Sequence, residues 1–320
     1  MTPRMLHGSL LILPLFLMMP VGLGGQDDLL EEADPCRVQL LAEVEAFVPG
    51  KAFWVGLRVE PDPGWHGYWH SPRDGGDGPI VAWKLPTGFT AGKLEWPVPE
   101  RLVEPGDLVV YGYRGAFLLR ARITPPAEVA AKSVRLEATV EWQVCEKICI
   151  YGKSEVSLEL AVAEETNSSM LGKGILDHWQ IQYPVPPSKE PSLVVEQKWG
   201  PLKPSEVGGR IEGGTWIVRW WRKVAEARGP QESWKVFAHD LPTGHSREAV
   251  VRNLRSSRNG QGSTWEARIE VEDLGVNFDL TQLGCLLVPS IGKAKGIVPA
   301  KKAITVRGIP SGRGKPKGRR

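Results

Sequence analysis

Cys145 and Cys149 are the two residues best placed to do chemistry together, because they lie four apart in the stretch EWQVCEKICIYG. Two thiols at this spacing can form a redox-active disulfide, a structural disulfide, part of a zinc site, or no bond at all. A zinc site would need two further ligands, and no second cysteine pair follows nearby. A structural bridge is disfavoured, because closing so short a loop limits the entropic stabilisation. The spacing favours the redox interpretation and leaves the others open.

The chain must bend between these two cysteines if they are to form a bond. A disulfide requires Cα atoms roughly 4.4–6.8 Å apart, whereas residues four apart in one extended strand are separated by about 13 Å. Apolar and polar residues alternate on both sides, in residues 140–144 and 156–160. This pattern predicts two strands whose tight connection carries the cysteines at a hairpin end. One helical turn is the alternative, since positions four apart share a helix face.

The first 25 residues predict an export signal. Arg4 precedes an apolar run at residues 10–19, and a small-residue stretch follows at residues 22–25. The run is about ten residues long, against the roughly 20 that a membrane-spanning helix needs. We therefore expect cleavage near Gln26, no transmembrane segment in the mature chain, and a periplasmic location. Outside the cytoplasm a thiol pair can persist as a disulfide.

The composition predicts an all-β protein. Among 320 residues, 36 glycines and 27 prolines favour short strands joined by turns. Strand-like alternation from Val38 to about Leu160 predicts an antiparallel sandwich, and similar segments recur after residue 192. The predicted organisation is a signal peptide at 1–25, a β-sandwich at 26–163, a linker at 164–191, a second β-rich domain at 192–308 and a basic disordered tail at 309–320.

The charge distribution argues against nucleic-acid binding. The chain carries a net charge of +3. Five basic residues fall within the last eight positions and another lies in the predicted signal, so the remaining body is net negative. The tail is predicted to be a solvated end, with binding to an anionic envelope polymer or lipid as the alternative.

Four segments, in this order, resemble the N-terminal periplasmic domain of the DsbD/ScsB family of thiol:disulfide interchange proteins. The resemblance covers about residues 36–162 and implies an immunoglobulin-like β-sandwich with Cys145 and Cys149 as its redox pair. It also implies thiol–disulfide oxidoreductase activity without a cofactor, relaying electrons between a membrane-embedded reductase and thioredoxin-like periplasmic proteins. The segments are PGWHGYWHSPRDGGDGP, WKLPTGFTAGKLEWPVPERL, VVYGYRGAFLL and EWQVCEKICIYGKSEVSLEL.

The same resemblance implies an aromatic cap over the reduced cysteines. Tyr111 and Tyr113 are the candidate cap residues, with Gly112 allowing a bend between them. Tyr68 and Trp69 lie in a segment similar to one that flanks the cysteines in the family. Ordinary core packing is the alternative for all four aromatic residues. By analogy with the family, Cys149 is expected to attack first.

The remaining candidate residues favour structural interpretations. His66 and His70 are four apart, but nearby glycine and proline argue against a helix that would aim both at a metal. Two aspartates in RDGGDG, Asp74 and Asp77, suggest a turn more than a calcium loop. A bridge between the other two cysteines rests only on their even count, and separate thiols are favoured. The tryptophans of WIVRWW predict a core strand, and they are Trp216, Trp220 and Trp221.

Two functions remain open at the level of sequence. The first is an exported interchange protein, although the membrane spans and thioredoxin-like domain of full-length family members find no counterpart here. No apolar run of 18 residues follows the signal. The second is a non-catalytic envelope binding or scaffolding protein in which the disulfide is structural.

Overall fold

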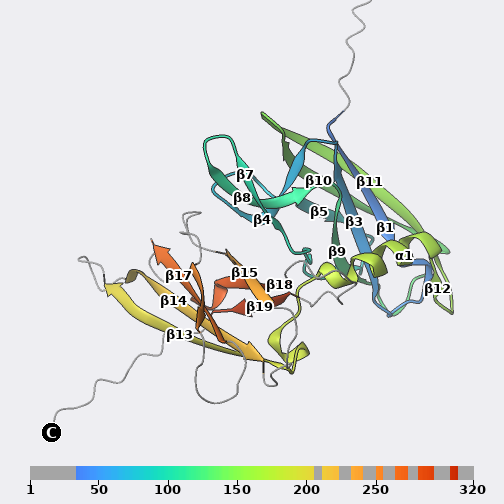
Figure 1. Ribbon diagram of the computed structural model, residues 1–320. Coiled ribbons are helices and arrows are strands. Elements are labelled where there is room, and N and C mark those ends of the chain that lie inside the picture. The colour runs from blue at the N-terminus through green and yellow to red at the C-terminus, as the bar shows by residue number, and fades with distance from the viewer. Residues whose placement is uncertain are drawn as a thin grey trace, which may run out of the picture. The chain divides into compact units, whose positions relative to one another are not determined.

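The structure is a computed structural model, and it describes residues 34–204, 211–222, 232–240, 250–254, 264–272, 280–291 and 303–308. The predicted signal peptide and the predicted basic tail lie outside the described residues. Within these ranges the chain is mostly β-strand (Figure 1). None of the described helices is long and apolar enough to cross a membrane.

The first β-rich part is a two-sheet sandwich, as predicted from the sequence. One sheet has the strand order β1-β3-β9-β6, and the other runs β12-β2-β11-β10-β4-β8-β7 with β5 also paired to β10. All pairs are antiparallel except β2 with β11. The strands are β1 Cys36–Ala42, β2 Val44–Phe47, β3 Phe53–Pro61, β4 His66–Arg73, β5 Ile80–Lys84, β6 Thr90–Ala91, β7 Glu100–Glu104, β8 Leu108–Arg114, β9 Phe117–Thr124, β10 Ser133–Cys145, β11 Cys149–Val162 and β12 Asn167–Ser168.

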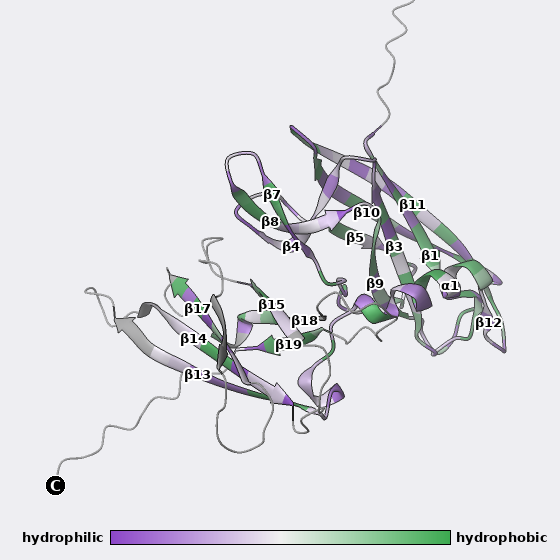
Figure 2. Ribbon diagram, in the orientation of Figure 1, coloured by the Kyte–Doolittle hydropathy of each residue, from purple (hydrophilic) through white to green (hydrophobic). Residues whose placement is uncertain are grey.

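Period-two alternation places one face of each strand in the core of this sandwich. In β3, the side chains of Val55, Leu57 and Val59 are fully buried, while Arg58 and Glu60 between them form an ion pair at 2.6 Å. Figure 2 shows hydrophobic and hydrophilic residues alternating along β10 and β11. The buried faces of the two sheets together form one apolar cluster.

The predicted linker folds against the first sandwich. It contains α1, Met170–Trp179, followed by the short 3₁₀ helices η1, Gln180–Gln182, and η2, Pro187–Lys189. Ser169 caps α1 by accepting a hydrogen bond from the Gly172 N–H. Leu176 packs on Leu41 and Leu118, so α1 lies against β1 and β3 (Figure 1). The segment thus contains one α-helix that packs on the sandwich.

The second β-rich part also consists of two sheets, β13-β14-β17-β16 and β15-β18-β19. Four tryptophans build its core, and among them Trp216 and Trp220 are fully buried. Their assignment to a core strand is therefore confirmed. Trp221 is half-buried. The elements are β13 Leu193–Pro204, β14 Ile211–Arg222, β15 Glu232–His239, β16 Val250–Leu254, β17 Thr264–Glu272, η3 Leu280–Gln282, β18 Gly284–Ile291 and β19 Ile304–Arg307.

The two isolated cysteines lie in different apolar clusters. Cys36 belongs to the core of the first sandwich and Cys285 to the core of the second β-rich part. Both thiols are free and buried. The structure therefore agrees with separate thiols rather than with a bridge between them.

Candidate functional site

The cysteine pair closes the longest hairpin of the described chain. β10 and β11 pair without interruption from Ser133↔Ala161 to Cys145↔Cys149. Cys145 ends β10 and Cys149 begins β11, so only residues 146–148 connect the two strands. The hairpin interpretation is therefore confirmed, and the helical-turn alternative is wrong at this position.

The two sulfur atoms are close but unequally exposed. Cys149 Sγ donates a hydrogen bond to Cys145 Sγ at 2.9 Å, and both residues are free thiols. Cys145 is only 5% exposed, whereas Cys149 is exposed to solvent. A disulfide partner approaching from solvent therefore reaches Cys149 first.

Residues from three other strands cover Cys145. Tyr68 of β4, Leu102 of β7 and Val110 of β8 form a small buried cluster with it. These strands are neighbours because β8 pairs with both β4 and β7. The β7–β8 hairpin thus provides an apolar cover on the protein side of the buried sulfur.

A polar chain connects the exposed sulfur to a carboxylate. The Tyr68 hydroxyl donates to Glu104 Oε1 at 2.6 Å and lies 3.5 Å from Cys149 Sγ. His66 Nε2 lies 2.8 Å from the same oxygen atom, with side-chain exposures of 12% for His66 and 11% for Glu104. The hydroxyl is thereby held beside the cysteines by a shielded carboxylate. Burial and the bond to Glu104 raise the pKa of Tyr68 well above its ordinary value, so the phenol stays protonated.

The environment keeps Cys145 in the thiol form. Burial, the hydrogen bond with Cys149 and the negative charge of Glu104 raise the pKa of Cys145 to about 11. The hydrogen bond with Tyr68 acts in the opposite direction, since it stabilises the thiolate. Of these influences burial is the largest. Cys145 is therefore a poor nucleophile at neutral pH until another group favours its deprotonation.

The four predicted aromatic residues fall in two different places. Tyr68 contacts the sulfurs, whereas Tyr111, Tyr113 and Trp69 belong to the main core cluster, which does not include Cys145. The Tyr113 ring stacks on Phe117 at 4.2 Å, and its hydroxyl donates to the Pro97 carbonyl. The rings of Tyr111 and Trp69 are 6.3 Å apart. The contacts that were expected from a cap are thus made by Tyr68.

Strand periodicity explains why the tyrosines of β8 belong to a different buried cluster from Cys145. Val110 and Gly112 point to one face of β8, and Tyr111 and Tyr113 point to the other. Gly112 lies so close to β4 that a Cβ atom there would be 2.2 Å from the Gly67 carbonyl oxygen. Sequence reasoning missed Leu102, Val110 and Glu104, although the Pro-Gly-Asp turn at 105–107 signals the hairpin that presents them.

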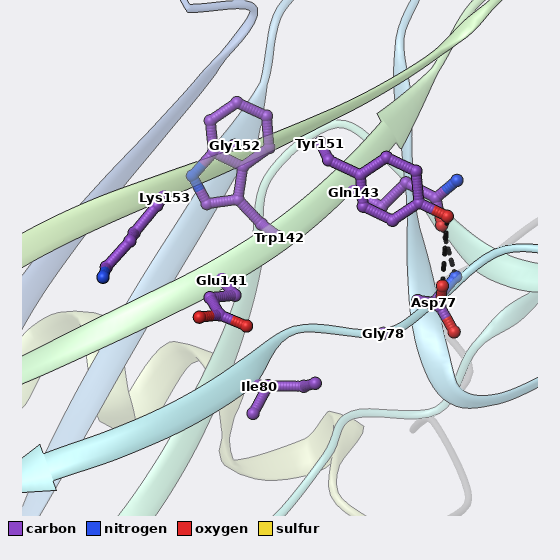
Figure 3. A pocket seen from close by; sticks show the side chains of 9 residues that line it. All are labelled: Asp77, Gly78, Ile80, Glu141, Trp142, Gln143, Tyr151, Gly152 and Lys153. Carbon is purple, nitrogen blue, oxygen red and sulfur yellow. Dashed lines mark hydrogen bonds between the residues drawn. The ribbon is translucent and has the colours of Figure 1, made fainter.

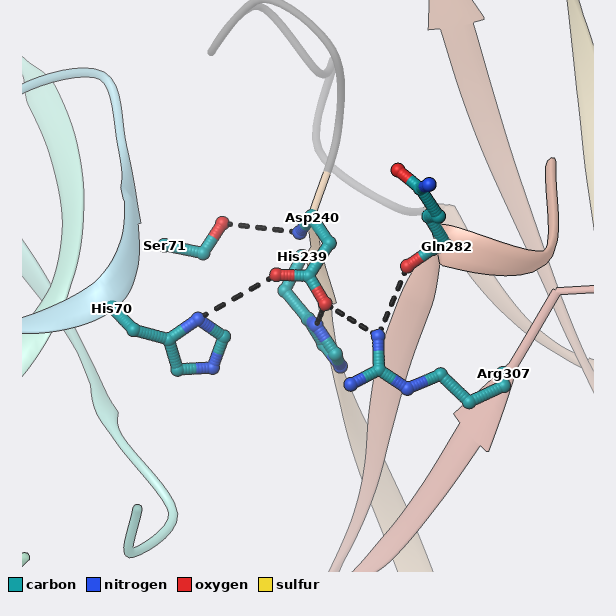
Figure 4. Close-up of polar contacts among 6 residues, drawn as sticks. All are labelled: His70, Ser71, His239, Asp240, Gln282 and Arg307. Atoms are coloured by element: carbon teal, nitrogen blue, oxygen red, sulfur yellow. Dashed lines mark hydrogen bonds and ion pairs between the residues drawn. The ribbon is translucent and has the colours of Figure 1, made fainter. Parts of the chain in front are cut away.

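The histidines and aspartates for which a metal role was disfavoured have other partners. His66 faces Glu104, and His70 Nδ1 lies 3.6 Å from Asp240 Oδ1 (Figure 4). Asp74 accepts a hydrogen bond from the Val109 N–H of β8. No group of three or more His, Cys, Asp or Glu side chains in the described ranges is arranged to hold a metal ion.

A groove of about 490 Å³ lies next to the cysteine hairpin (Figure 3). Three short segments line it, namely 77–80, 141–143 and 151–153. The Tyr151 hydroxyl donates to Asp77 Oδ2 at 3.2 Å, and the Asp77 N–H donates to the side-chain oxygen of Gln143. These contacts join the walls of the groove two residues away from each cysteine.

The first β-rich part is an immunoglobulin-like sandwich with a close cysteine pair at a hairpin end, and comparison with known families indicates its class. Residues 37–161 match the family of the N-terminal domain of the thiol:disulfide interchange protein DsbD. This part of the chain is similar to a DsbD N-terminal domain, and the match supports a thiol:disulfide interchange protein. A search of the curated proteins finds no match.

Solved structures that are similar to the chain include the following two. The N-terminal periplasmic domain of ScsB from Proteus mirabilis is 16% identical with a TM-score of 0.54, and the alignment covers 92% of this chain and 97% of that chain. The N-terminal domain of DsbD from Neisseria meningitidis, in its reduced form, is 12% identical with a TM-score of 0.25, covering 42% of this chain and 90% of that chain. The ScsB likeness concerns the fold.

Proposed function

We propose that this protein relays electrons by thiol–disulfide exchange at Cys145 and Cys149. The observation that carries the proposal is the asymmetry of the pair: an exposed sulfur lies 2.9 Å from a buried one at the end of a hairpin. Exchange requires one sulfur that a partner can reach and a second within bonding distance of the first. The geometry supplies both.

The reduced protein acts in two steps. The Cys149 thiolate attacks one sulfur of the partner's disulfide, the partner's S–S bond breaks, and its other sulfur leaves as a thiolate. Cys145 then loses its proton and attacks Cys149 Sγ, which releases the partner as a dithiol and leaves a Cys145–Cys149 disulfide. Two electrons pass to the partner, and the two thiol protons end on the partner or in water. The same two steps in reverse, with a reduced donor dithiol, convert the Cys145–Cys149 disulfide back to two thiols.

The surrounding residues separate these steps. Because burial raises the pKa of Cys145 to about 11, it does not compete with Cys149 for the first attack. The Tyr68 hydroxyl stabilises the Cys145 thiolate once a mixed disulfide has formed, which favours the resolving attack. Leu102 and Val110 exclude water from the buried sulfur.

The proposed electron donor is a membrane-embedded thiol reductase, and the proposed acceptors are thioredoxin-like periplasmic proteins. This part of the proposal is supported by the family that residues 37–161 match. We place the relay in the periplasm, with export through the segment at residues 1–25. No nucleic acid and no cofactor take part.

Trapping experiments test the exchange function. The Cys145→Ala variant is expected to accumulate mixed disulfides through Cys149 in the periplasm, because the resolving thiol is missing. The Cys149→Ala variant is expected to accumulate none, and Cys36→Ala serves as a control that removes a buried thiol elsewhere. Failure of both active-site variants to trap any protein would favour the alternative of a binding or scaffolding protein with a structural disulfide.

The reduction potential of the pair distinguishes the same alternatives independently. Equilibration with a glutathione redox buffer, followed by alkylation and mass measurement, gives the potential of the Cys145–Cys149 bond. An exchange pair is expected above about −300 mV, whereas structural disulfides generally lie below that value.

A further inference from the structure

The groove and the reactive sulfur lie on the same face of the cysteine hairpin. The cross-strand pair Gln143↔Tyr151 is two positions along the ladder from Cys145↔Cys149, and side chains two apart in a strand share a face. Two residues of strand span about 6.6 Å. If an extended partner segment places its reactive cysteine at Cys149, the partner residue two positions away on the same face therefore lies over the groove.

The groove has an apolar centre and a charged edge. Its surface is mostly apolar, and the side chains of Ile80 and Tyr151 are 62% and 68% exposed. The cross-strand pair Glu141↔Lys153 is four positions along the ladder from Cys145↔Cys149, and Figure 3 shows both charged side chains on the side of the groove away from Tyr151 and Asp77. An apolar centre with a polar edge is the usual anatomy of a protein-binding surface.

The groove is also formed in advance. The hydrogen bonds of Asp77 with Tyr151 and with Gln143 hold the loop before β5 against the β10–β11 hairpin. A surface held in one arrangement costs less conformational entropy on binding than a mobile one. The exposed apolar groups are thus presented in a fixed geometry beside Cys149.

We propose that this groove binds an apolar side chain located two residues from the reactive cysteine of the partner protein. The inference rests on the proposed exchange function and specifies which partners the site prefers. The proposal is supported by the position of the groove, which begins at Tyr151, the next residue of β11 on the same face as Cys149. The occupant is an extended partner segment, because strand periodicity brings such a segment to both features at once.

Two chromogenic peptides test the proposal on the full chain. The peptides Ac-Leu-Gly-Cys-Gly-Leu-NH₂ and Ac-Ser-Gly-Cys-Gly-Ser-NH₂ are each prepared as mixed disulfides with thionitrobenzoate. The Cys149 thiolate of the reduced protein attacks the peptide sulfur, coloured thionitrobenzoate leaves as a thiolate, and Cys145 then releases the reduced peptide while the protein disulfide forms. The symmetric design places leucine on both sides, so it does not depend on chain direction.

The leucine peptide is expected to react about tenfold faster than the serine peptide at low peptide concentration, which corresponds to about 1.4 kcal/mol. Ile80→Ser and Tyr151→Ser are expected to reduce this ratio to below about threefold. The matched control is Leu171→Ser, which removes a leucine that is 71% exposed on α1 and is expected to keep the tenfold ratio.

The outcomes separate the groove from the exchange function. Equal, rapid release from both peptides would overturn the groove proposal and leave exchange intact, while no release from either peptide would overturn exchange itself. A tenfold ratio that survives both groove variants would also overturn the groove. If the protein self-associates and Ile80→Ser abolishes the association without any peptide preference, the groove serves a second copy and the proposal is wrong.

Discussion

The Tyr68 hydroxyl lies 3.5 Å from Cys149 Sγ and is held there by its hydrogen bond to Glu104. The Tyr68 hydroxyl thus contacts the cysteine pair from β4, next to the apolar side chains of Leu102 and Val110 that cover Cys145. Because its hydrogen bond lowers the pKa of Cys145 against the effect of burial, Tyr68 sets how readily the buried thiol ionises.

Tyr68→Phe is therefore expected to raise the pKa of Cys145 further, since a hydrogen bond that stabilises the thiolate is lost. The resolving step should slow correspondingly, and mixed disulfides should live longer. The pH dependence of Cys145 alkylation, followed by mass spectrometry of the Cys149→Ser protein with and without the change, measures the shift. Tyr113→Phe is the control, because that hydroxyl donates to the Pro97 carbonyl within the main core. Equal Cys145 pKa values with and without the Tyr68 hydroxyl would remove Tyr68 from the mechanism.

Two glycines are expected to respond in opposite directions to alanine. A Cβ atom at Gly152 would lie 2.2 Å from the Trp142 ring, so Gly152→Ala should lower the free energy of unfolding by about 1–3 kcal/mol. Gly174 lies within α1, and a Cβ atom there would meet no atom within 4 Å apart from its chain neighbours and the backbone of its own helix, so Gly174→Ala should raise the free energy of unfolding by about 0.4–1 kcal/mol. Urea denaturation of both variants checks the pair, and a neutral result at Gly152 would show that Trp142 moves freely.

Arg120 is expected to anchor the segment after α1. Its guanidinium group is nearly buried, pairs with Glu95 at 2.7 Å, bonds Gln180 and lies 3.7 Å from the Tyr183 ring centroid. Arg120→Leu should cost roughly 2–3 kcal/mol of unfolding free energy, because these polar and ring contacts are lost together.

Arg135→Ala is the matched control for that change. Arg135 also pairs with a glutamate, Glu137, but both side chains are exposed, at 63% and 46%. Its removal should change the unfolding free energy by less than about 0.5 kcal/mol. Similar losses in the two variants, measured by urea denaturation, would contradict the anchoring role.

Acid is expected to destabilise the fold through His70. Burial, together with the neighbouring His239, lowers the pKa of His70 to about 4, although Asp240 acts in the opposite direction. The unfolded chain binds the proton near pH 6.5, so stability due to neutral His70 is present above that pH and is lost as the pH falls from about 6.5 towards 4. The loss should reach up to roughly 3 kcal/mol.

The His70→Gln variant isolates this contribution. Urea denaturation between pH 4 and pH 7 covers both the folded and the unfolded pKa of His70. Over this range the free energy of unfolding should depend less on pH in the variant than in the natural chain. Parallel curves for the two proteins would mean that His70 does not titrate in this range.

The sequence predicted the β-sandwich and the hairpin because both depend on local patterns. Alternation fixes which residues of β10 and β11 share a face, and three residues between the cysteines leave room only for a tight turn. In the structure the two strands pair without interruption from residue 133 to residue 161.

The cover over the buried sulfur was less accessible to sequence reasoning. Tyr68 and Glu104 are 36 residues apart, and their contact depends on β8 pairing with β4 on one side and β7 on the other. Periodicity within a single strand cannot predict which distant strands will pair with β8. Val110 lies in the cluster around Cys145 and its neighbour Tyr111 lies in the main core, because one residue along a strand reverses the face to which a side chain points.

The short separation of Cys145 and Cys149 has a consequence for how the protein matures. Oxidative folding joins whichever thiols meet first, and ends separated by few residues meet far more often than distant ones. The hairpin brings this pair together through its own strands, while Cys36 and Cys285 become enclosed in separate cores. We expect correct pairing to precede completion of the sandwich, so that scrambled disulfides are rare and no isomerase is needed to reach the native bond.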